Sequence, residues 1–497
     1  MKDDKDDGES GVATGRLFLT VFPSIMLPMF LAVVDQTIVA TALPAIAASL
    51  GSVERVSWVV VAYLVATTIA APVYGQLRDV YSGRRMMFVA LAIFIAASLF
   101  CAAATSIELL AVGRILQGLG GGGLMTLSQA LIGEAIPPRE RARYQGYLAA
   151  VMVMSSTFGP VAGGYLTEHL GWRSIFLVNV PLGCVAVLLT LRLQLRPVRE
   201  QAWTFDSFGL LLLIAFIAPS LLALDQVRYG QPGALTAFAV LMGFGLAALV
   251  ALIRHERRAA FPLLPITLLR QPTIWRSDAL AACHGGVLVS LLTFLPIWMH
   301  VGQGRTAAQT GLMLLPLVFG IGAGSMLTGR VVSRTGLTLI FPSIGLIFVT
   351  LWQIMLALWG GTFTPTQLGA FLFFDGLFMG TVMGVVQVTV QNAVGVASLG
   401  AAVASVQLSR SIGAAIGTAL VGTVLFAMLA GGDGQTARLF ASIVRQDMSV
   451  VAALSPMSQA ALYADIAGAF RAAFLTIAAF AAIGTLVAWS IPSRRLT

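Results

Sequence analysis

Residues 17–43 read LFLTVFPSIMLPMFLAVVDQTIVATAL and contain one charged side chain, that of Asp35. A helix needs about 20 apolar residues to cross a bilayer, so this segment is long enough to span a membrane. A carboxyl group in such a segment is costly to remove from water, and it therefore marks a candidate functional site. The segment predicts a membrane-spanning helix with an acid in its interior.

The rest of the chain repeats this apolar pattern. Hydrophobic residues make up 58% of the 497, charged residues make up only 10%, and the mean hydropathy is +0.90. The apolar runs are continuous rather than alternating, which indicates helices and not the strands of a barrel. We expect an all-α polytopic membrane protein with fourteen spans, at residues 17–43, 56–77, 86–104, 109–136, 144–166, 175–195, 208–224, 234–253, 279–301, 311–332, 337–359, 368–390, 403–429 and 467–491.

The Lys and Arg residues predict the orientation of these spans, because cytoplasmic loops are enriched in both. With the N-terminus inside, 21 of the 30 fall in cytoplasmic tails and loops, seven lie on the opposite side, and Arg114 and Arg410 lie within spans. Both termini are therefore expected in the cytoplasm, and the protein is expected in the cytoplasmic (inner) membrane of a bacterium.

Composition and motifs argue against several function classes. The net charge of +9 is spread over many short loops, which does not suit nucleic-acid binding. Cys101, Cys184 and Cys283 fall within predicted spans and are expected to pack rather than to form disulfides. The sequence shows neither a P-loop nor a Cys/His ligand cluster, so we expect no metal, no cofactor and no ATP hydrolysis. An ion gradient, most simply of protons, is the expected energy source.

The spans group into a predicted domain order. We expect a cytoplasmic tail at 1–16, a six-helix half at 17–200, two linker helices at 201–258 and a second six-helix half at 259–497. Paired halves are a recurrent transporter design, with the substrate site near the midplane. Residues 431–465 are too polar to span, and their apolar residues have helical spacing. We expect a small helical hairpin there on the outer face, with a disordered linker as the alternative.

Five segments in chain order resemble signatures of the fourteen-helix drug:proton antiporters, the DHA2 branch of the major facilitator superfamily. The resemblance covers essentially the whole chain, and its signatures lie in the N-terminal half. They are residues 34–44 in the first span, 75–85 in the following cytoplasmic turn, 114–120 in the fourth span, 159–164 in the fifth span and 172–183 at the entry to the sixth.

The resemblance implies a major facilitator fold and a proton-coupled carrier, and it draws attention to two buried charges. Scarce water around Asp35 favours its neutral form, so this carboxyl can take up a proton on one side and lose it on the other. Family resemblance implies that Arg114 couples proton occupancy to conformation, with Asp35 as one possible ion partner. A structural acid and a structural ion pair are the alternatives.

Two other signatures point to conformational change. Gly159 has no side chain, and Pro160 has no backbone N–H to donate. The fifth span is therefore expected to kink there. Gly163 and Gly164 are expected to let another helix approach closely.

In the turn that begins at Gly75, Asp79 is expected to bind a helix N-terminus or an Arg and to act with Arg84 and Arg85 as a latch. Val80 stands where the family pattern has Arg, so this latch is expected to be weaker or differently built.

The second half offers a further acid and a further buried cation. Asp375 is a candidate for a second proton-coupling acid, with a solvated residue at the cavity mouth as the alternative. Arg410 is expected to be the buried partner of an acid, and Asp375 is the nearest candidate. The predicted substrate cavity is formed by Asp35, Gln36, Gln117, Gln129, Asp375, Gln387, Gln407 and Arg410.

Together these features predict a proton-coupled multidrug efflux antiporter that exports amphipathic or cationic compounds by alternating access. A dedicated exporter of a metabolite, lipid or siderophore is the alternative within the same fold, and a non-transporting membrane sensor or scaffold is the alternative from another class. The expected partners are a small lipophilic or cationic substrate, protons and the bilayer, with a periplasmic adaptor as an option. We expect a monomer.

Overall fold

The computed structural model describes residues 4–50, 57–193, 205–227, 234–259, 261–263, 268–305, 307–395, 398–430, 436, 439–440, 443, 454–492 and 495. Within these ranges, the side chains of residues 4–21, 57, 139, 224–227, 234–235 and 307–308 are not described. The described residues form helices, and their only β-type pairing is an isolated bridge between Leu337 and Arg495.

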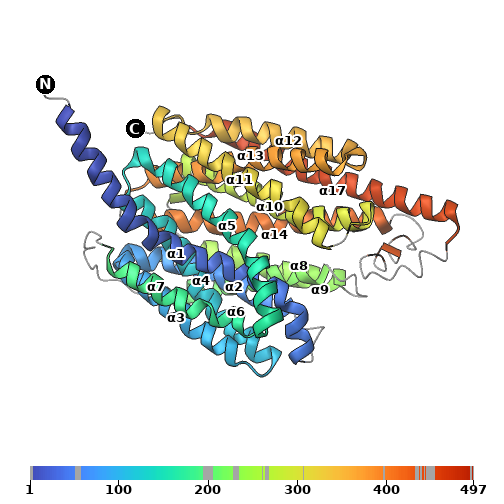
Figure 1. Cartoon of the computed structure of the whole chain (residues 1–497), viewed down its shortest axis with the longest axis horizontal. Helices are drawn as coiled ribbons and strands as arrows, with labels where there is room; N and C mark the ends of the chain where they lie inside the picture. The colour runs from blue at the N-terminus through green and yellow to red at the C-terminus, as the bar shows by residue number, and fades with distance from the viewer. Residues whose placement is uncertain are drawn as a thin grey trace. The chain divides into compact units, whose positions relative to one another are not determined.

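The chain is all-α over its described length (Figure 1). The helices are α1 (Asp4–Leu50), α2 (Ser57–Val80), α3 (Gly83–Ala103), α4 (Ile107–Ala135), α5 (Pro138–Leu170), α6 (Ser174–Leu177), α7 (Asn179–Leu191), α8 (Ser207–Val227), α9 (Ala234–Glu256), α10 (Pro272–Gln303), α11 (Ala307–Thr335), α12 (Ile340–Trp359), α13 (Pro365–Ala393), α14 (Leu399–Ala430) and α17 (Pro456–Ser490). Short 3-10 turns occupy Leu268–Arg270 and Gly360–Thr362.

Over the described residues, each predicted span is mainly helical, which confirms the all-α fold. Twelve helical segments among the described residues are long and apolar enough to cross a membrane. The fourth predicted span, α4, is not among them because it carries glycines and buried polar groups such as Arg114 and Gln117. The described apolar part of α8, Ser207–Ala223, is shorter than the others. The sixth span is divided between α6 and α7 at Val178.

The helices divide into two compact units. Unit 1 contains Met1–Leu221, Phe244–Leu269 and Val390–Leu408, and unit 2 contains Leu222–Gly243, Arg270–Thr389 and Ser409–Thr497. The first turns of α14 therefore belong to unit 1 and the rest of that helix to unit 2. The predicted domain boundaries remain a prediction.

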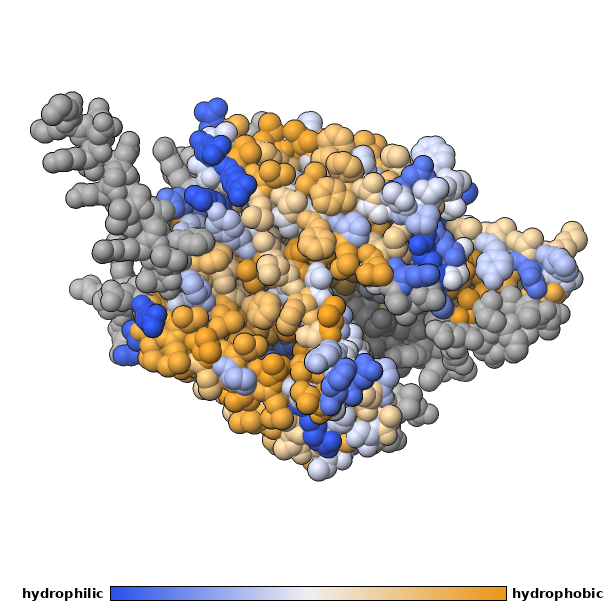
Figure 2. Space-filling model, viewed as in Figure 1, coloured by the Kyte–Doolittle hydropathy of each residue, from blue (hydrophilic) through white to orange (hydrophobic). Residues whose placement is uncertain are grey.

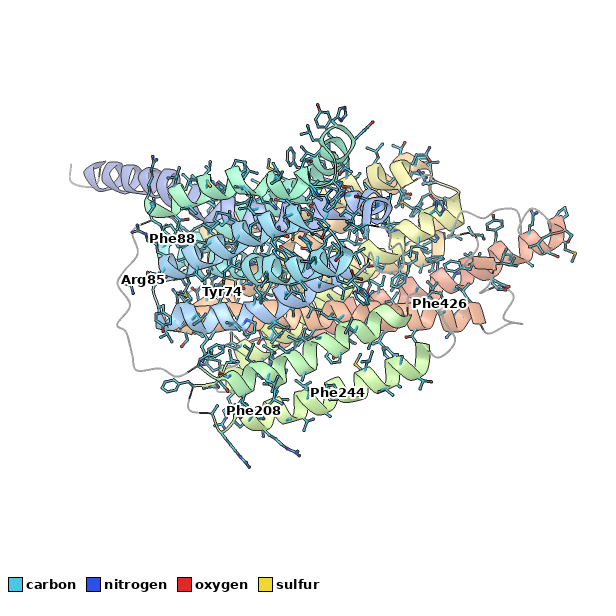
Figure 3. The ribbon with its side chains drawn as sticks, turned by 90° about the horizontal axis from the view of Figure 1, so that it is seen from below. Tyr74, Arg85, Phe88, Phe208, Phe244 and Phe426 are labelled. Atoms are coloured by element: carbon cyan, nitrogen blue, oxygen red, sulfur yellow. The ribbon has the colours of Figure 1, made fainter. Side chains whose placement is uncertain are left out.

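Apolar side chains fill each unit and also cover its outside. In unit 1, α1, α3 and α4 bury residues such as Leu31, Phe94 and Leu127 in one cluster. Large apolar residues are also exposed, among them Phe208 on α8 and Phe244 on α9 (Figure 3). Figure 2 shows such orange surfaces, with blue residues mainly near helix ends. Because lipid tails are as apolar as these side chains, this distribution suits a membrane protein.

The helix bounds near the chain ends can be compared with two of the predicted segments. The outer loop was expected to reach residue 465, but α17 begins at Pro456. The Ser455 hydroxyl accepts a hydrogen bond from the Ser458 amide, and Pro456 occupies the first turn, where proline favours helix initiation. Most of 431–455 lies outside the described residues, so the hairpin itself stays a prediction. The predicted tail at 1–16 is helical from Asp4 onward and continuous with the first span.

Candidate functional site

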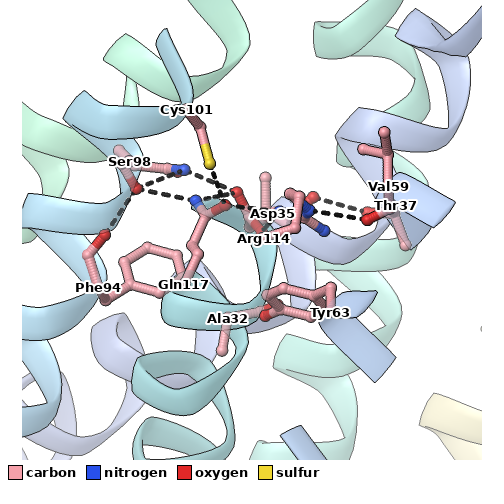
Figure 4. Close-up of polar contacts among 12 residues, drawn as sticks. Ala32, Asp35, Thr37, Val59, Tyr63, Phe94, Ser98, Cys101, Arg114 and Gln117 are labelled. Atoms are coloured by element: carbon pink, nitrogen blue, oxygen red, sulfur yellow. Dashed lines mark hydrogen bonds and ion pairs between the residues drawn. The ribbon is translucent and has the colours of Figure 1, made fainter. Parts of the chain in front are cut away.

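Asp35 lies where four helices of unit 1 converge (Figure 4). The carboxyl is fully buried, and its neighbours come from α1, α3, α4 and α7. Arg114 on α4 is 1% exposed and donates from Nη1 to Asp35 Oδ2 across 2.5 Å. Asp35 Oδ1 accepts from Gln117 Nε2 and from Asn179 Nδ2, each at 2.8 Å. Both oxygens of the acid are thus satisfied by protein donors.

The Arg114 guanidinium has further contacts that do not involve Asp35. Its Nη1 also donates to Gln117 Oε1 at 2.7 Å, and its Nε donates to the carbonyl of Val59 at 3.2 Å. The guanidinium carbon lies 4.1 Å from the centre of the Tyr63 ring and 5.9 Å from that of Phe176. Aromatic faces attract cations, so these two rings stabilise the buried Arg114 guanidinium in addition to its hydrogen bonds.

A second layer of side chains holds the amides in place. Ser98 Oγ accepts from Gln117 Nε2 at 2.8 Å and donates to the Phe94 carbonyl at 2.7 Å. The Cys101 thiol lies 3.6 Å from Gln117 Oε1, within reach of a weak hydrogen bond. Tyr63 donates its hydroxyl to the carbonyl of Ala32, one turn before Asp35, at 3.0 Å. These contacts connect α1, α2, α3 and α4 through polar groups in an otherwise apolar interior.

The glycines of α4 allow this convergence. A Cβ added to Gly118 would lie 2.7 Å from the Tyr63 carbonyl of α2, and one added to Gly120 would lie 2.7 Å from the Phe94 amide of α3. Because such distances are far below van der Waals contact, both neighbours can approach α4 only where it has no side chain. The glycine run is a helix-packing feature, as its position within a span predicts.

Asp79 binds the N-terminus of a helix. Its Oδ1 accepts from the Gly400 amide at 2.8 Å and its Oδ2 from the Ala401 amide at 2.9 Å, at the start of α14. The unpaired amides at a helix start favour a negative charge. Arg78 donates to Asp79 at 2.8 Å and to Glu134 at the end of α4 at 2.7 Å. This is the kind of partner predicted for Asp79.

Gly75, Arg84 and Arg85 belong to the same turn as Asp79 but do not share its contacts. Gly75 packs directly against α14, since an added Cβ would lie 2.6 Å from the Gly400 carbonyl. Arg84 lies over the Phe88 ring at 5.7 Å, and Arg85 is exposed (Figure 3). Neither arginine makes a described contact with Asp79, whose cationic neighbour is Arg78 instead. Their predicted part in the latch is therefore not supported by the geometry.

The glycines of α5 differ from one another. An added Cβ on Gly159 would clash with the Thr37 hydroxyl of α1, and one on Gly163 would lie 2.6 Å from the Ile38 carbonyl. Gly164 has nothing within 4 Å of its Cβ position. Close packing was expected at both Gly163 and Gly164, and this is wrong for Gly164, which faces outward from the helix pair. Pro160 lies inside a continuous α5, where it removes one helical hydrogen bond.

Asp375 has a different environment from Asp35. It is fully buried on α13, and its Oδ2 accepts from Gln353 Nε2 on α12 at 2.8 Å. Its Oδ1 and Gln353 Oε1 have no hydrogen-bond partner among the described residues. A mouth-facing, solvated Asp375 is therefore wrong for this structure. Arg410 was expected to pair with Asp375, but no described ion pair joins them, and Asp375 binds an amide instead.

The comparisons with known proteins agree with this architecture. A family model described as Major Facilitator Superfamily matches residues 25–418. The chain belongs to the Major Facilitator Superfamily. Its fourteen spans are consistent with the fourteen-helix branch of that superfamily.

Several relatives within this superfamily are named as transporters. The multidrug transporter protein MdtP of Bacillus subtilis is 31% identical over 414 residues, which cover 81% of this chain and 74% of MdtP. Multidrug resistance protein 3 of the same organism is 27% identical over 80% of this chain and 78% of its own length. A protein of Mycobacterium tuberculosis named an uncharacterised MFS-type transporter is 30% identical over 81% of this chain, but only 59% of that relative is matched.

Solved superfamily structures share the fold at low sequence identity. The human organic anion transporter MFSD10 is 15% identical, with a TM-score of 0.66 and coverage of 94% of this chain and 98% of that one. The proton:xylose symporter XylE is 13% identical, with a TM-score of 0.64 and coverage of 97% and 98%. The chain is thus a multi-pass membrane protein, and its superfamily is one of transporters rather than enzymes.

The remaining predicted cavity residues are dispersed along the superfamily fold. Gln36 is half-buried, whereas Gln129, Gln387 and Gln407 are buried. Gln129 Oε1 and both amide atoms of Gln387 have no hydrogen-bond partner among the described residues. Unsatisfied amides suit a polar cavity surface, but none of these four joins the Asp35 network by a described hydrogen bond. Their role in a substrate cavity stays a prediction.

Several polar residues of these sites were not predicted from the sequence. They are Ser98 and Asn179 in the Asp35 network, Gln353 beside Asp375, and Arg78 and Glu134 beside Asp79. Asn179 and Gln353 are isolated polar residues in apolar spans, and that signal alone marks both as candidates. The sequence does not reveal which acid each one contacts, because their partners lie on other helices.

Proposed function

We propose that the chain is a proton-coupled antiporter that exports amphipathic or cationic compounds across a bacterial cytoplasmic membrane by alternating access. The observation that carries this proposal is the fully buried ion pair between Asp35 and Arg114. An ionisable pair inside a membrane protein is expensive and marks ion or substrate pathways. The names of the Bacillus subtilis relatives support drug export as the task. Both termini lie in the cytoplasm in this proposal.

Asp35 is the proposed site of proton binding. Its three neighbours all donate hydrogen bonds to it, so the carboxylate acts only as an acceptor. A proton that binds Oδ2 removes the acceptor that faces Arg114 and cancels the negative charge of the Asp35 carboxylate. A cationic substrate and a proton then compete for one negative charge, and uptake of a proton from outside favours release of the substrate.

Arg114 is the proposed element that transmits this event. When Asp35 is neutral, the guanidinium keeps its hydrogen bonds to Gln117 and to the Val59 carbonyl and its contact with the Tyr63 ring. These contacts come from α4 and α2, whereas Asp35 belongs to α1. Protonation therefore loosens α1 from α4 without expelling the cation, which is the two-state behaviour that alternating access requires.

Two further sites complete the proposal. Asp79 on α2 acts as a latch, because its carboxylate accepts hydrogen bonds from two backbone amides at the start of α14. This contact is made in one conformation and broken in another. Asp375 serves as a second proton-coupling acid, with Gln353 holding it in position. A proton on Oδ1 would turn this oxygen into a donor, and the nearby amide of Gln353 has an acceptor, Oε1, that lacks a described partner.

The test combines transport with stability. Proton-gradient-driven movement of a fluorescent lipophilic cation is measured in inverted vesicles for the native chain, for Asp35→Asn and for Asp35→Asn combined with Arg114→Gln. Removing one member of a buried pair costs about 3–5 kcal/mol, whereas removing both leaves no uncompensated charge. We expect the single variant to be inactive and less stable, and the double variant to regain stability but not gradient-driven transport.

The control is Arg330→Gln, which removes an exposed positive charge on α11. It should transport and unfold like the native chain. Gradient-driven transport that survives in the double variant would refute the role of Asp35 and leave Asp375 as the next acid to test. A native chain that is folded but does not move cations would favour a dedicated substrate instead.

A further inference from the structure

Arg410 is a cation in unit 2 for which the described residues supply no counter-charge. It lies in the α14 span, and its Nε is buried without a hydrogen-bond partner. Across the described residues, no hydrogen bond, ion pair or aromatic contact to its guanidinium is found. Unlike a carboxyl, a guanidinium cannot escape burial by changing its protonation state. A charge of this kind inside a membrane span calls for an anion from elsewhere.

The side chain of Arg410 runs along α10. A Cβ added to Gly285 would lie 3.1 Å from Arg410 Cγ, so the absence of a side chain at Gly285 leaves room for the arginine. His284 directly precedes this glycine on α10 and is 4% exposed. Two polar groups from two helices of unit 2 are therefore neighbours in an apolar interior.

The hydrogen bonding of His284 defines what the pair can recognise. Its Nε2 lies 3.2 Å from the carbonyl oxygen of Met379, and a carbonyl can only accept, so Nε2 carries a hydrogen. Its Nδ1 is buried and has no hydrogen-bond partner among the described residues. The neutral ring thus presents a lone pair at Nδ1, and Arg410, which packs against the neighbouring Gly285, has an N–H donor at Nε without a described partner. A ligand group must offer an acceptor to the N–H of Arg410 Nε and a proton to His284 Nδ1.

A carboxyl group meets both requirements. One oxygen accepts from Arg410 Nε, and the other shares a proton with His284 Nδ1, either as O–H···N or as O⁻···H–N⁺. Chloride and sulfonate lack that proton and leave the imidazole lone pair unmatched. Asp375 and Asp278 are buried acids of this unit, but neither forms a described ion pair with Arg410, and Asp375 binds Gln353 instead.

We propose that Arg410 and His284 form a binding site for the carboxyl group of an amphipathic weak acid. The inference rests on the proposed transport function and widens its substrate class from cations to amphiphiles that carry a carboxyl group. The site would hold the acid group of such a substrate while the apolar body lies against the surrounding helices.

The test measures binding to the purified full chain in an uncharged detergent. Equilibrium dialysis compares 2-naphthoate, naphthalene-2-sulfonate and 2-naphthylmethylammonium, which share one ring system, with inorganic phosphate and chloride as competitors. The variants are Arg410→Gln, Arg410→Lys and His284→Gln, and Arg330→Gln is the charge-matched control on an exposed site. Thermal unfolding of each variant shows whether it is folded.

We expect naphthoate to bind the native chain and to bind Arg410→Gln about tenfold more weakly or worse, because a hydrogen bond to a charged group is lost. Arg410→Lys should retain part of the affinity, His284→Gln should lose the preference for naphthoate over the sulfonate, and Arg330→Gln should match the native chain. Equal naphthoate binding by the native chain and by Arg410→Gln would overturn the proposal, as would displacement by millimolar chloride, which would indicate an inorganic anion. If cation transport persists in either case, the proposed function stands without this site.

Discussion

At the residue scale, what distinguishes the buried acids Asp35 and Asp375 is the chemistry of their neighbours. Asp35 is surrounded by donors, one of them a cation, whereas Asp375 has one amide and an oxygen with no described partner. Burial alone therefore does not define a role. A proton would cancel the charge that faces Arg114 at Asp35, whereas at Asp375 it would add a donor beside an amide.

Asn179 allows a test of this distinction. Replacing it with Ala removes a donor 2.8 Å from the charged Asp35, and bonds to charged groups contribute about 1.5–3 kcal/mol. Ser98→Ala removes a neutral contact to Gln117 and should cost about 1 kcal/mol. Ser98→Ala also removes a longer contact to Asn179, at 3.4 Å, but no bond to a charged group. We therefore expect Asn179→Ala to lower the thermal unfolding midpoint more than Ser98→Ala. Equal losses would mean that Asn179 contributes packing rather than support for the carboxylate.

At the element scale, glycines determine which helices approach closely. In unit 1, α4 meets α2 and α3 at Gly118 and Gly120. In unit 2, α11 and α13 meet in the same way, since Gly324 faces Leu377 and Gly376 faces Leu317. Without a hydrophobic driving force between helices in lipid, such contacts supply much of the packing energy. The glycine spacing predicts that a helix has a surface for close packing, but it does not predict which helix packs there.

The neighbouring glycines of α5 make a matched pair for a test. Gly163→Ala places a methyl group against Ile38 of α1, and overpacking costs about 1–3 kcal/mol. Gly164→Ala meets nothing and should be neutral or slightly stabilising, because Ala favours helix by about 1 kcal/mol over Gly. Thermal unfolding in detergent and cation efflux from cells would compare them. A larger defect in Gly164→Ala would contradict the packing of α1 on α5.

At the scale of the whole molecule, the two units carry different kinds of buried charge. Unit 1 contains an acid and a cation that compensate each other, and unit 2 contains an acid and a cation that do not pair. This asymmetry is consistent with the proposed roles, which are proton coupling at Asp35 and Asp375 and recognition of a substrate acid group at Arg410.

The distribution of Lys and Arg predicts the orientation of the whole chain. In a variant whose three cysteines are replaced by Ser, single cysteines are introduced as Lys2→Cys, Thr497→Cys and Arg305→Cys. A membrane-impermeant maleimide should label position 305 in intact spheroplasts and positions 2 and 497 only after permeabilisation. Labelling of either terminus in intact spheroplasts would reverse the predicted orientation or place the two termini on opposite sides.

The fold and the principal acid were predictable from the sequence, because continuous apolar runs and an isolated Asp35 are local features that need no knowledge of neighbours. Likewise, the five signatures indicated the superfamily before any contact was known. The tertiary structure alone decided which groups meet: Asp35 with Asn179, Asp79 with the start of α14, Asp375 with Gln353, and Arg410 with Gly285 of α10 rather than with an acid. Each of these pairs joins residues on different helices. Hydropathy determines that a helix crosses the membrane, but the face it turns to its neighbours depends on glycine contacts and polar pairing across the whole unit.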